Sequence, residues 1–568
     1  MTIHVDVTHR RAPLAIAFGF LVCVATASNA QGFAETLLKA QAASEAKQWS
    51  TAAPLWEQVV RANPVNGQFA LQLANALYQA KDYRKAIPAW EKALALRIGF
   101  PANMAYNIAC SYALLGEKEQ AFTWLSRSFD MGMRNLERAR TDSDLVSLHD
   151  DPRFATIVGL PDVSTMSRDE GWRSDLALLA REVKRKGYGE GVYRALSKQD
   201  FDAGVKKLND AIPTLSDRQI FVELMKLMKQ VGDGHTGILR PPAQPEFLLA
   251  LPLQFYLFQE GLFVIAADPK YKELLGARVV RFGDRSVDEV MRALDPVISR
   301  DNEVWPLQVA PYRMRSLPLL RALGVTADPR TIALTIDSDG KQRAVTVEAD
   351  ANHPDIWNEF PATWVTFPQA MGKPLPLYLK NTAANYWFEY QPDTKVLYFQ
   401  FNAVANDAKE PLAQFAERLF QFINGHSVSK FVIDMRWNNG GNTTLIPPLL
   451  NRVIRSEIVD ERGKLFVIIG RRTYSAAQNA ATYFERYTNA TFVGEPTGSS
   501  PNFVGEEMPF TLPYSKIVAN VSDLYWKTGW PMDYRTWIAP QIYTPPTFAS
   551  YRAGRDPAME AILALPAR

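Results

Sequence analysis

The sequence contains little cysteine, and this shortage limits how the chain can be stabilised. Among its 568 residues only Cys23 and Cys110 are cysteines, and Cys23 lies in an apolar N-terminal segment that we expect to be removed. A chain left with Cys110 alone has no intramolecular disulfide and no zinc site built from several cysteines. Its stability must therefore come from buried apolar surface, and a chain of this length can bury enough of it.

The chain also lacks an excess of charge of one sign. Its 63 basic and 60 acidic residues give a formal net charge of +3, without a dense basic run, so we expect no nucleic-acid partner. No apolar run after residue 30 reaches the length needed to cross a membrane. The length predicts several domains, on the order of three or four.

The first 30 residues have the pattern of a signal peptide. Arg10 and Arg11 supply positive charge, residues 14–27 are apolar but short for a membrane span, and Ser28-Asn29-Ala30 offers small residues for cleavage. An uncleaved anchor is the alternative. We therefore expect the mature protein to be exported, either periplasmic or secreted, without stable insertion in the membrane after cleavage.

Residues 31–135 contain an internal repeat. Trp49, Ala52, Pro54 and Trp56 recur 34 residues later as Tyr83, Ala86, Pro88 and Trp90. This is the period of a helix–turn–helix unit, and a third copy fits loosely from Ile108 onward. The segment resembles a tetratricopeptide repeat array, which implies an α-helical solenoid. Such a solenoid either binds a protein partner in its groove or caps the next domain.

The rest of the chain divides by the spacing of its apolar residues. Residues 136–250 are interpreted as a linker and a helical region, because apolar residues recur there at helical spacing. Residues 251–350 contain strands and turns in an order that resembles a PDZ-like module, although residues 295–330 are longer than such a module needs. Residues 351–568 alternate strands and helices, which predicts an α/β domain with parallel strands.

Three polar clusters interrupt these elements. Asp233-Gly234-His235-Thr236 is expected to form a tight loop that exposes the imidazole, although a lone loop histidine is more often an ordinary surface residue. Gly440-Gly441 follows an apolar strand, and its N–H groups either bind an oxyanion or simply end the strand. Ser475 stands between a strand and a helix, where a nucleophile can be exposed. With Gln478 it also matches a capping box, which only starts a helix.

Taken in order, these clusters resemble the tail-specific, or C-terminal processing, serine peptidase family, which includes the core of tricorn protease. Asp233-Gly234-His235-Thr236 is similar to its Asp-Gly-His-Thr element, and residues 433–441 to its Ile-Asp-Leu-Arg-x-Asn-x-Gly-Gly element. Ser475-Ala476-Ala477-Gln478 matches Ser-Ala-x-Glu except at its last residue, and Val493-Gly494-Glu495-Pro496-Thr497 matches the next element. The resemblance covers about residues 165–568. It implies a crotonase-like α/β catalytic domain with an inserted PDZ-like module, and neither a metal nor an organic cofactor.

A missing lysine decides which branch of the family the chain resembles. Many members use a Ser–Lys dyad, but no lysine lies between Ser475 and Lys516, and Ser500 stands at the matching position. The tricorn-like branch uses the histidine instead. The resemblance therefore implies that Ser475 is the nucleophile and His235 the general base, a task that suits an imidazole near neutral pH.

The resemblance also implies supporting residues. The N–H of Ala476, with that of Gly440 or Gly441, would bind the oxyanion. The tricorn-like branch has a downstream acidic residue, for which Asp533 is the best positional match and Glu495 and Glu506 are the alternatives.

The sequence thus predicts an exported serine peptidase that hydrolyses a peptide or protein substrate through an acyl-enzyme. Two alternatives stay open. A non-catalytic peptide-binding scaffold that keeps the peptidase fold is favoured by the missing lysine and by the repeats. An exported carbohydrate or ester hydrolase has less support, because no pair of catalytic carboxylates can be identified from sequence spacing.

Overall fold

The computed structural model describes residues 31–133, 136–159, 163–187, 198–242, 244–351, 361, 363–506, 509–522 and 524–566. The expected signal peptide lies outside these residues. The chain forms two compact units, Met1–Pro161 and Asp162–Arg568. Within the described ranges, no helix is both long and apolar enough to cross a membrane.

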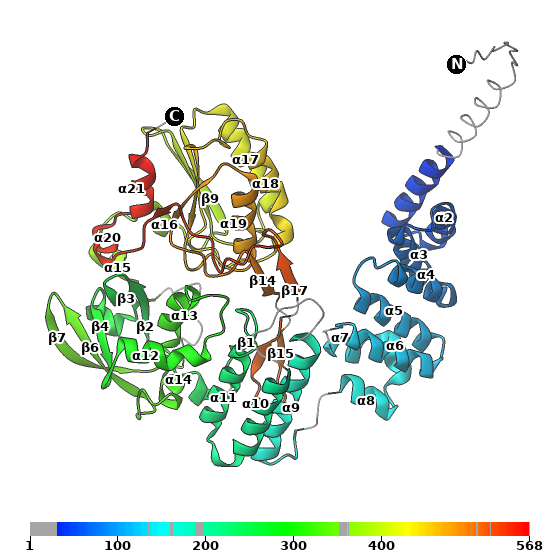
Figure 1. The fold of residues 1–568 in the computed structure, drawn as a ribbon, viewed down its shortest axis with the longest axis horizontal. Helices are drawn as coiled ribbons and strands as arrows, with labels where there is room; N and C mark the ends of the chain where they lie inside the picture. The colour runs from blue at the N-terminus through cyan, green and yellow to red at the C-terminus, as the bar shows by residue number, and fades with distance from the viewer. Residues whose placement is uncertain are drawn as a thin grey trace, which may run out of the picture. The chain divides into compact units, whose positions relative to one another are not determined.

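The first unit is a series of helices in which each packs against the next (Figure 1). They are α2 (Trp49–Ala62), α3 (Gly67–Gln79), α4 (Tyr83–Ala95), α5 (Pro101–Leu114) and α6 (Lys118–Asp130). The repeated small residues Ala52, Ala86 and Ala121 are fully buried, so neighbouring helices can approach closely. The short helices α7 (Leu136–Thr141) and α8 (Pro152–Val158) belong to the same unit, which extends past the expected boundary at residue 135.

The second unit begins with helices that share a core with an antiparallel sheet. The helices are α9 (Arg168–Gly187), α10 (Lys198–Ala211) and α11 (Asp217–Lys229). The sheet has the order β2 (Leu253–Phe258), β3 (Gly261–Ala267), β4 (Arg278–Phe282), β6 (Thr331–Ser338) and β7 (Lys341–Glu348), with two short strands at its side. The hairpin turn between β6 and β7 lies at Asp339-Gly340, and both residues have positive φ, as a tight hairpin turn requires.

The last third of the chain forms a six-stranded sheet in the order β18-β13-β12-β11-β10-β9, with β18 (Ile542–Tyr543) and β9 (Tyr386–Gln391) at its edges. Its central strands, β10 (Val396–Phe401), β11 (Lys430–Asp434), β12 (Leu465–Ile469) and β13 (Thr491–Gly494), are parallel. One face packs against α17 (Leu412–Gly425), α18 (Pro447–Ile454) and α19 (Ala476–Tyr487), and the other against α21 (Pro557–Ala564). The predicted α/β domain with parallel strands is therefore confirmed.

Two small sheets bring distant segments of the second unit together. In the first, β1 (Gly237–Arg240) pairs with β16 (Val518–Asn520), which also pairs with β15 (Pro509–Thr511). In the second, β14 (Asn502–Gly505) pairs with β17 (Leu524–Lys527). Because β1 starts two residues after His235, the first pairing holds the histidine loop against the C-terminal part of the chain.

Candidate active site

Ser475 occupies the turn between β12 and α19 in a strained backbone conformation. Its φ of 54° and ψ of −127° are rare for residues other than glycine and cost on the order of 1–3 kcal/mol. Its side chain makes no capping hydrogen bond, so the predicted capping box is wrong. Gln478 instead donates to Oγ1 of Thr482 at 3.2 Å. Helix initiation therefore does not explain the strained backbone of Ser475.

The glycine turn after β11 lies against this serine. Gly440 and Gly441 have φ values of 107° and 133°, which only glycine adopts easily. A Cβ at Gly440 would lie 2.6 Å from Cβ of Ser475 and 2.9 Å from the backbone nitrogen of Ala476. The α-carbon of Gly440 therefore packs directly against the serine side chain and the first backbone nitrogen of α19.

The expected oxyanion donors differ in their hydrogen bonding. The N–H of Gly440 already donates to Oδ1 of Asn438 at 3.0 Å. The N–H groups of Gly441 and Ala476 have no acceptor among the residues that the structure describes. Of the expected donors, these two are the ones available to a ligand.

His235 is buried, contrary to the prediction of an exposed imidazole. Its ring stacks on Tyr474 and on Phe503, with centroids 4.6 and 5.4 Å away. Burial lowers its pKa to about 4, and the backbone of Val504 opposes this shift. The imidazole is therefore neutral at physiological pH. The side chain of His235 bonds through Nδ1 to the hydroxyl of Tyr474 at 3.0 Å, whereas Nε2 has no partner in the described part of the chain.

The backbone of the histidine loop is held from two directions. Oδ1 of Asp233 accepts the N–H groups of His235 and Thr236 at 3.0 and 2.6 Å. The side-chain amide of Asn520 donates to the carbonyl of His235 at 2.8 Å. The Asp-Gly-His-Thr element therefore forms a rigid loop whose aspartate binds its backbone.

Asp301 is a residue of the site that the sequence did not identify. Its carboxylate accepts the N–H of Gly234 at 2.7 Å and binds the hydroxyl of Ser499. Burial raises its pKa to about 7; the bond to Ser499 opposes this shift and the nearby Asp233 adds to it. The excess length of residues 295–330 was the sequence signal that could have directed attention to it.

Tyr474 links His235 to the segment that carries Ser475. Tyr474 directly precedes Ser475 in the chain, and its hydroxyl bonds to His235. No hydrogen bond joins the side chains of His235 and Ser475, both of which the structure describes.

The acidic candidates have other environments. Asp533 accepts hydrogen bonds from Arg535, Glu495 forms a buried ion pair with Arg471, and the side chain of Glu506 is exposed. None of them hydrogen-bonds to His235 in the described structure. The hydroxyl of Tyr474 stands where a supporting carboxylate was expected.

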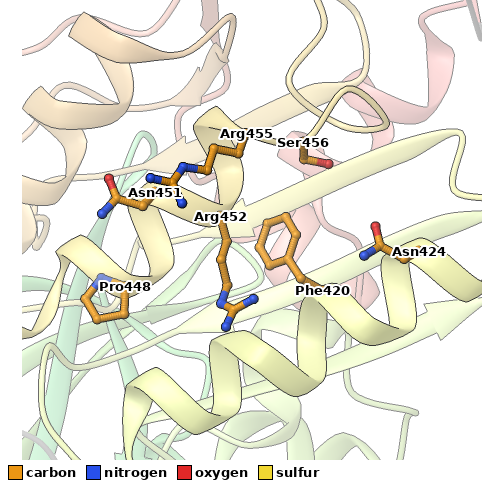
Figure 2. A pocket seen from close by; sticks show the side chains of 7 residues that line it. All are labelled: Phe420, Asn424, Pro448, Asn451, Arg452, Arg455 and Ser456. Carbon is orange, nitrogen blue, oxygen red and sulfur yellow. The ribbon is translucent and has the colours of Figure 1, made fainter.

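Two further groupings lie outside this site. A cavity of about 410 Å³ is lined by Phe420, Asn424, Pro448, Asn451, Arg452, Arg455 and Ser456 (Figure 2). It contains none of the expected catalytic residues.

Among the described residues, the one group with metal-ligand spacing is Cys110, Asp142 and Asp144 in the first unit. Tyrosine hydroxyls already bind both of these carboxylates.

The tetratricopeptide repeat family matches residues 37–103 and 71–130. The first unit contains tetratricopeptide repeats. No curated protein matches the sequence at a significant level. Among solved structures, mature CPAF complexed with lactacystin is similar at a TM-score of 0.48 and 12% identity, over 69% of this chain and 97% of that one.

Two further solved structures are more distant. The photosystem II D1 C-terminal processing protease has a TM-score of 0.33 and 13% identity, over 70% of this chain and 97% of that one. Tricorn protease has a TM-score of 0.32 and 11% identity, over 70% of this chain and 36% of that one. These likenesses are too remote to support an argument about catalysis, which depends on the geometry of the site.

Proposed function

We propose that the second unit is a serine peptidase that forms an acyl-enzyme at Ser475. The observation that carries this proposal is the strained backbone of Ser475, whose side chain makes no capping hydrogen bond and whose Cβ packs against Gly440, beside the backbone nitrogen of Ala476. A non-glycine residue in such a conformation is typical of functional sites, and a strained serine between a strand and a helix is typical of hydrolase nucleophiles. The order of the sequence motifs supports the same reaction.

In the proposed mechanism, Oγ of Ser475 attacks the peptide carbonyl while His235 accepts its proton. The N–H groups of Ala476 and Gly441 bind the oxyanion of the tetrahedral intermediate. The intermediate expels the amine, which takes the proton from His235, and water then hydrolyses the acyl-enzyme with the same base. Substrate binding would complete the contact between the imidazole and the serine, because catalytic hydrogen bonds often form only when substrate is bound.

The proposal also covers the location of the protein and the roles of its other parts. Residues 1–30 support export to the periplasm or outside the cell. The antiparallel sheet that contains β2–β7 serves as the PDZ-like module and holds a peptide end by strand addition. The repeats bind a protein partner. Substrates are peptides or proteins, and no cofactor takes part.

The scaffold alternative is favoured by one observation, the missing hydrogen bond between His235 and Ser475. A fluorophosphonate probe separates the two functions. We expect it to label the folded chain of residues 31–568 at Ser475 and to leave Ser475→Ala unlabelled. Ser500→Ala is the matched control, because the Ser500 hydroxyl donates to the carbonyl of Thr536 and contacts none of the proposed catalytic groups in the described part of the chain. If the folded wild-type chain stays unlabelled across its stable pH range, the scaffold is the correct function.

A further inference from the structure

A tyrosine, rather than a carboxylate, contacts the imidazole of His235. In serine hydrolases with a catalytic triad, a third group bonds to one ring nitrogen, fixes the tautomer and leaves the other nitrogen to act as the base. Here the hydroxyl of Tyr474 lies 3.0 Å from Nδ1, and Nε2 is buried without a partner among the described residues. Tyr474 therefore occupies the position from which the tautomer of His235 can be set.

Packing fixes the place of this hydroxyl. The Tyr474 ring lies between His235 and Trp305, with centroids 4.6 and 4.0 Å away and interplanar angles of 21° and 12°. Phe503 covers the other side of the imidazole at 5.4 Å. Tyr474 is only 5% exposed. A ring enclosed in such a stack keeps its hydroxyl at one point, as a positioning group requires.

Gly234 provides the space that the hydroxyl occupies. A Cβ at Gly234 would lie 2.3 Å from the Tyr474 hydroxyl oxygen and 3.1 Å from Oδ1 of Asp301. Gly234 is not among the residues with positive φ, so its backbone conformation does not require glycine. Glycine is required there because a side chain would collide with the tyrosine hydroxyl. Its N–H is bound by Asp301, which holds the loop at this distance. The glycine before the histidine thus permits the contact between Tyr474 and His235.

We propose that Tyr474 is a positioning residue for His235: its oxygen accepts the Nδ1–H, so that Nε2 keeps its lone pair for the proton of Ser475. This inference rests on the proposed peptidase function and deepens it. The tautomer of a neutral imidazole is set by the partner of one nitrogen, and the opposite tautomer would carry a proton on Nε2 and could not act as a base there. Because Ser475 follows Tyr474 directly, one backbone segment places both the nucleophile and the partner of its base.

The variant Tyr474→Phe tests this role, because it keeps the aromatic stack and removes only the hydroxyl. We expect the maximal rate of fluorophosphonate labelling to fall by about tenfold or more, while the probe concentration for half-maximal rate stays unchanged. Gly234→Ala should have the same effect by displacing the hydroxyl. Tyr386→Phe is the control: it removes another buried hydroxyl, which donates to the carbonyl of Glu410 at 2.6 Å, and should leave both constants unchanged.

A second measurement does not depend on activity. In the chain of residues 31–568 with ¹⁵N-labelled histidine, the ring signals of His235, assigned by their loss in His235→Gln, should show a proton fixed on Nδ1. Tyr474→Phe should convert them to a mixture of tautomers. A wild-type proton on Nε2, or wild-type labelling kinetics in Tyr474→Phe, would overturn the inference. If the wild-type chain is not labelled at all, the peptidase function fails, and the ring signals still decide whether Tyr474 holds Nδ1.

Discussion

Gly440 lies so close to Ser475 that a methyl group on its α-carbon would sit 2.6 Å from the serine Cβ. Real side chains do not approach each other so closely. Only a glycine lets this turn pack directly against Ser475 and the backbone nitrogen of Ala476. This close contact keeps the Gly440-Gly441 turn beside the start of α19.

The first prediction concerns this contact between Gly440 and Ser475. Gly440→Ala should abolish labelling of Ser475 and destabilise the second unit by about 2 kcal/mol or more, because overpacking adds to backbone strain. Gly324→Ala is the matched control, since Gly324 also has positive φ but has no atom within 4 Å of the point where a Cβ would lie. It should cost only about 1 kcal/mol and leave labelling intact. Urea unfolding and probe labelling measure both effects, and equal losses at the two sites would contradict the prediction.

The strain at Ser475 predicts an unusual order of stabilities. Ser475→Gly should be more stable than Ser475→Ala by about 1 kcal/mol, because glycine adopts a φ of 54° without steric cost. At Ser500, which is not among the residues with positive φ, alanine should be the more stable replacement. Denaturant unfolding of the four variants tests this order. If alanine is also favoured at position 475, the backbone there is not strained.

The lowered pKa of His235 predicts activity in mild acid. Because burial holds this pKa at about 4, the imidazole stays neutral well below the ordinary histidine value. The labelling rate should therefore change little between neutral pH and about pH 5.5. A histidine base with the ordinary pKa of about 6.5 would lose roughly nine-tenths of its activity over the same range. Repeating the profile in Asp301→Asn removes any contribution from that carboxyl group. A rate that halves near pH 6.5 in both proteins would show that the base is not buried.

Asp301 predicts a pH dependence of stability. Burial raises the pKa of Asp301 to about 7 in the folded chain, whereas the unfolded chain has the ordinary value of 3.8. Between these two pH values, the carboxyl group is protonated in the folded state and ionised in the unfolded state. The free energy of unfolding should therefore fall as pH rises through this window, by at most about 1.4 kcal/mol per pH unit. His235 contributes the opposite slope, because its folded pKa is lowered. Subtracting the stability of Asp301→Asn from that of wild type cancels the histidine, and a flat difference would contradict the prediction.

Cys110 offers a probe of the first unit. It is the one cysteine in residues 31–568, it is 1% exposed, and burial raises the pKa of its thiol. A thiol reagent should therefore react with the chain of residues 31–568 only as the repeats unfold. The rate in increasing urea should follow the loss of helical signal and should be the same in Ser475→Ala. Rapid reaction in the native state would show that the repeats open around Cys110.

The sequence predicted the parts of the fold that depend on local pattern. The repeat was visible because Ala52 and Ala86 must both be small for their helices to pack, which places them at equal spacing. The parallel strands were visible because β11 and β12 are buried along their whole length, with an apolar centre in β11 and only apolar residues in β12. Long-range contacts leave no such pattern.

Three features of the site depend on those long-range contacts or on backbone geometry. The burial of His235 depends on Tyr474 and Phe503, which are more than two hundred residues away in the sequence. Asp301 matters only because folding places it beside Gly234. The capping box failed because Ser475 has a positive φ in place of the extended backbone of an N-cap residue, and its side chain makes no capping hydrogen bond.

The pairing of β1 with β16 also sets when the site can be completed during synthesis. Asn520, at the end of β16, binds the carbonyl of His235 from a position 285 residues later in the chain. A chain on the ribosome that has emerged only as far as α19 already contains Ser475, but it lacks the strand and the amide that hold the histidine loop. Under the proposed mechanism, such a chain would carry the nucleophile without a fixed base. The proposed activity should therefore arise only after Asn520 has been made, which limits attack on other nascent chains and on the protein itself.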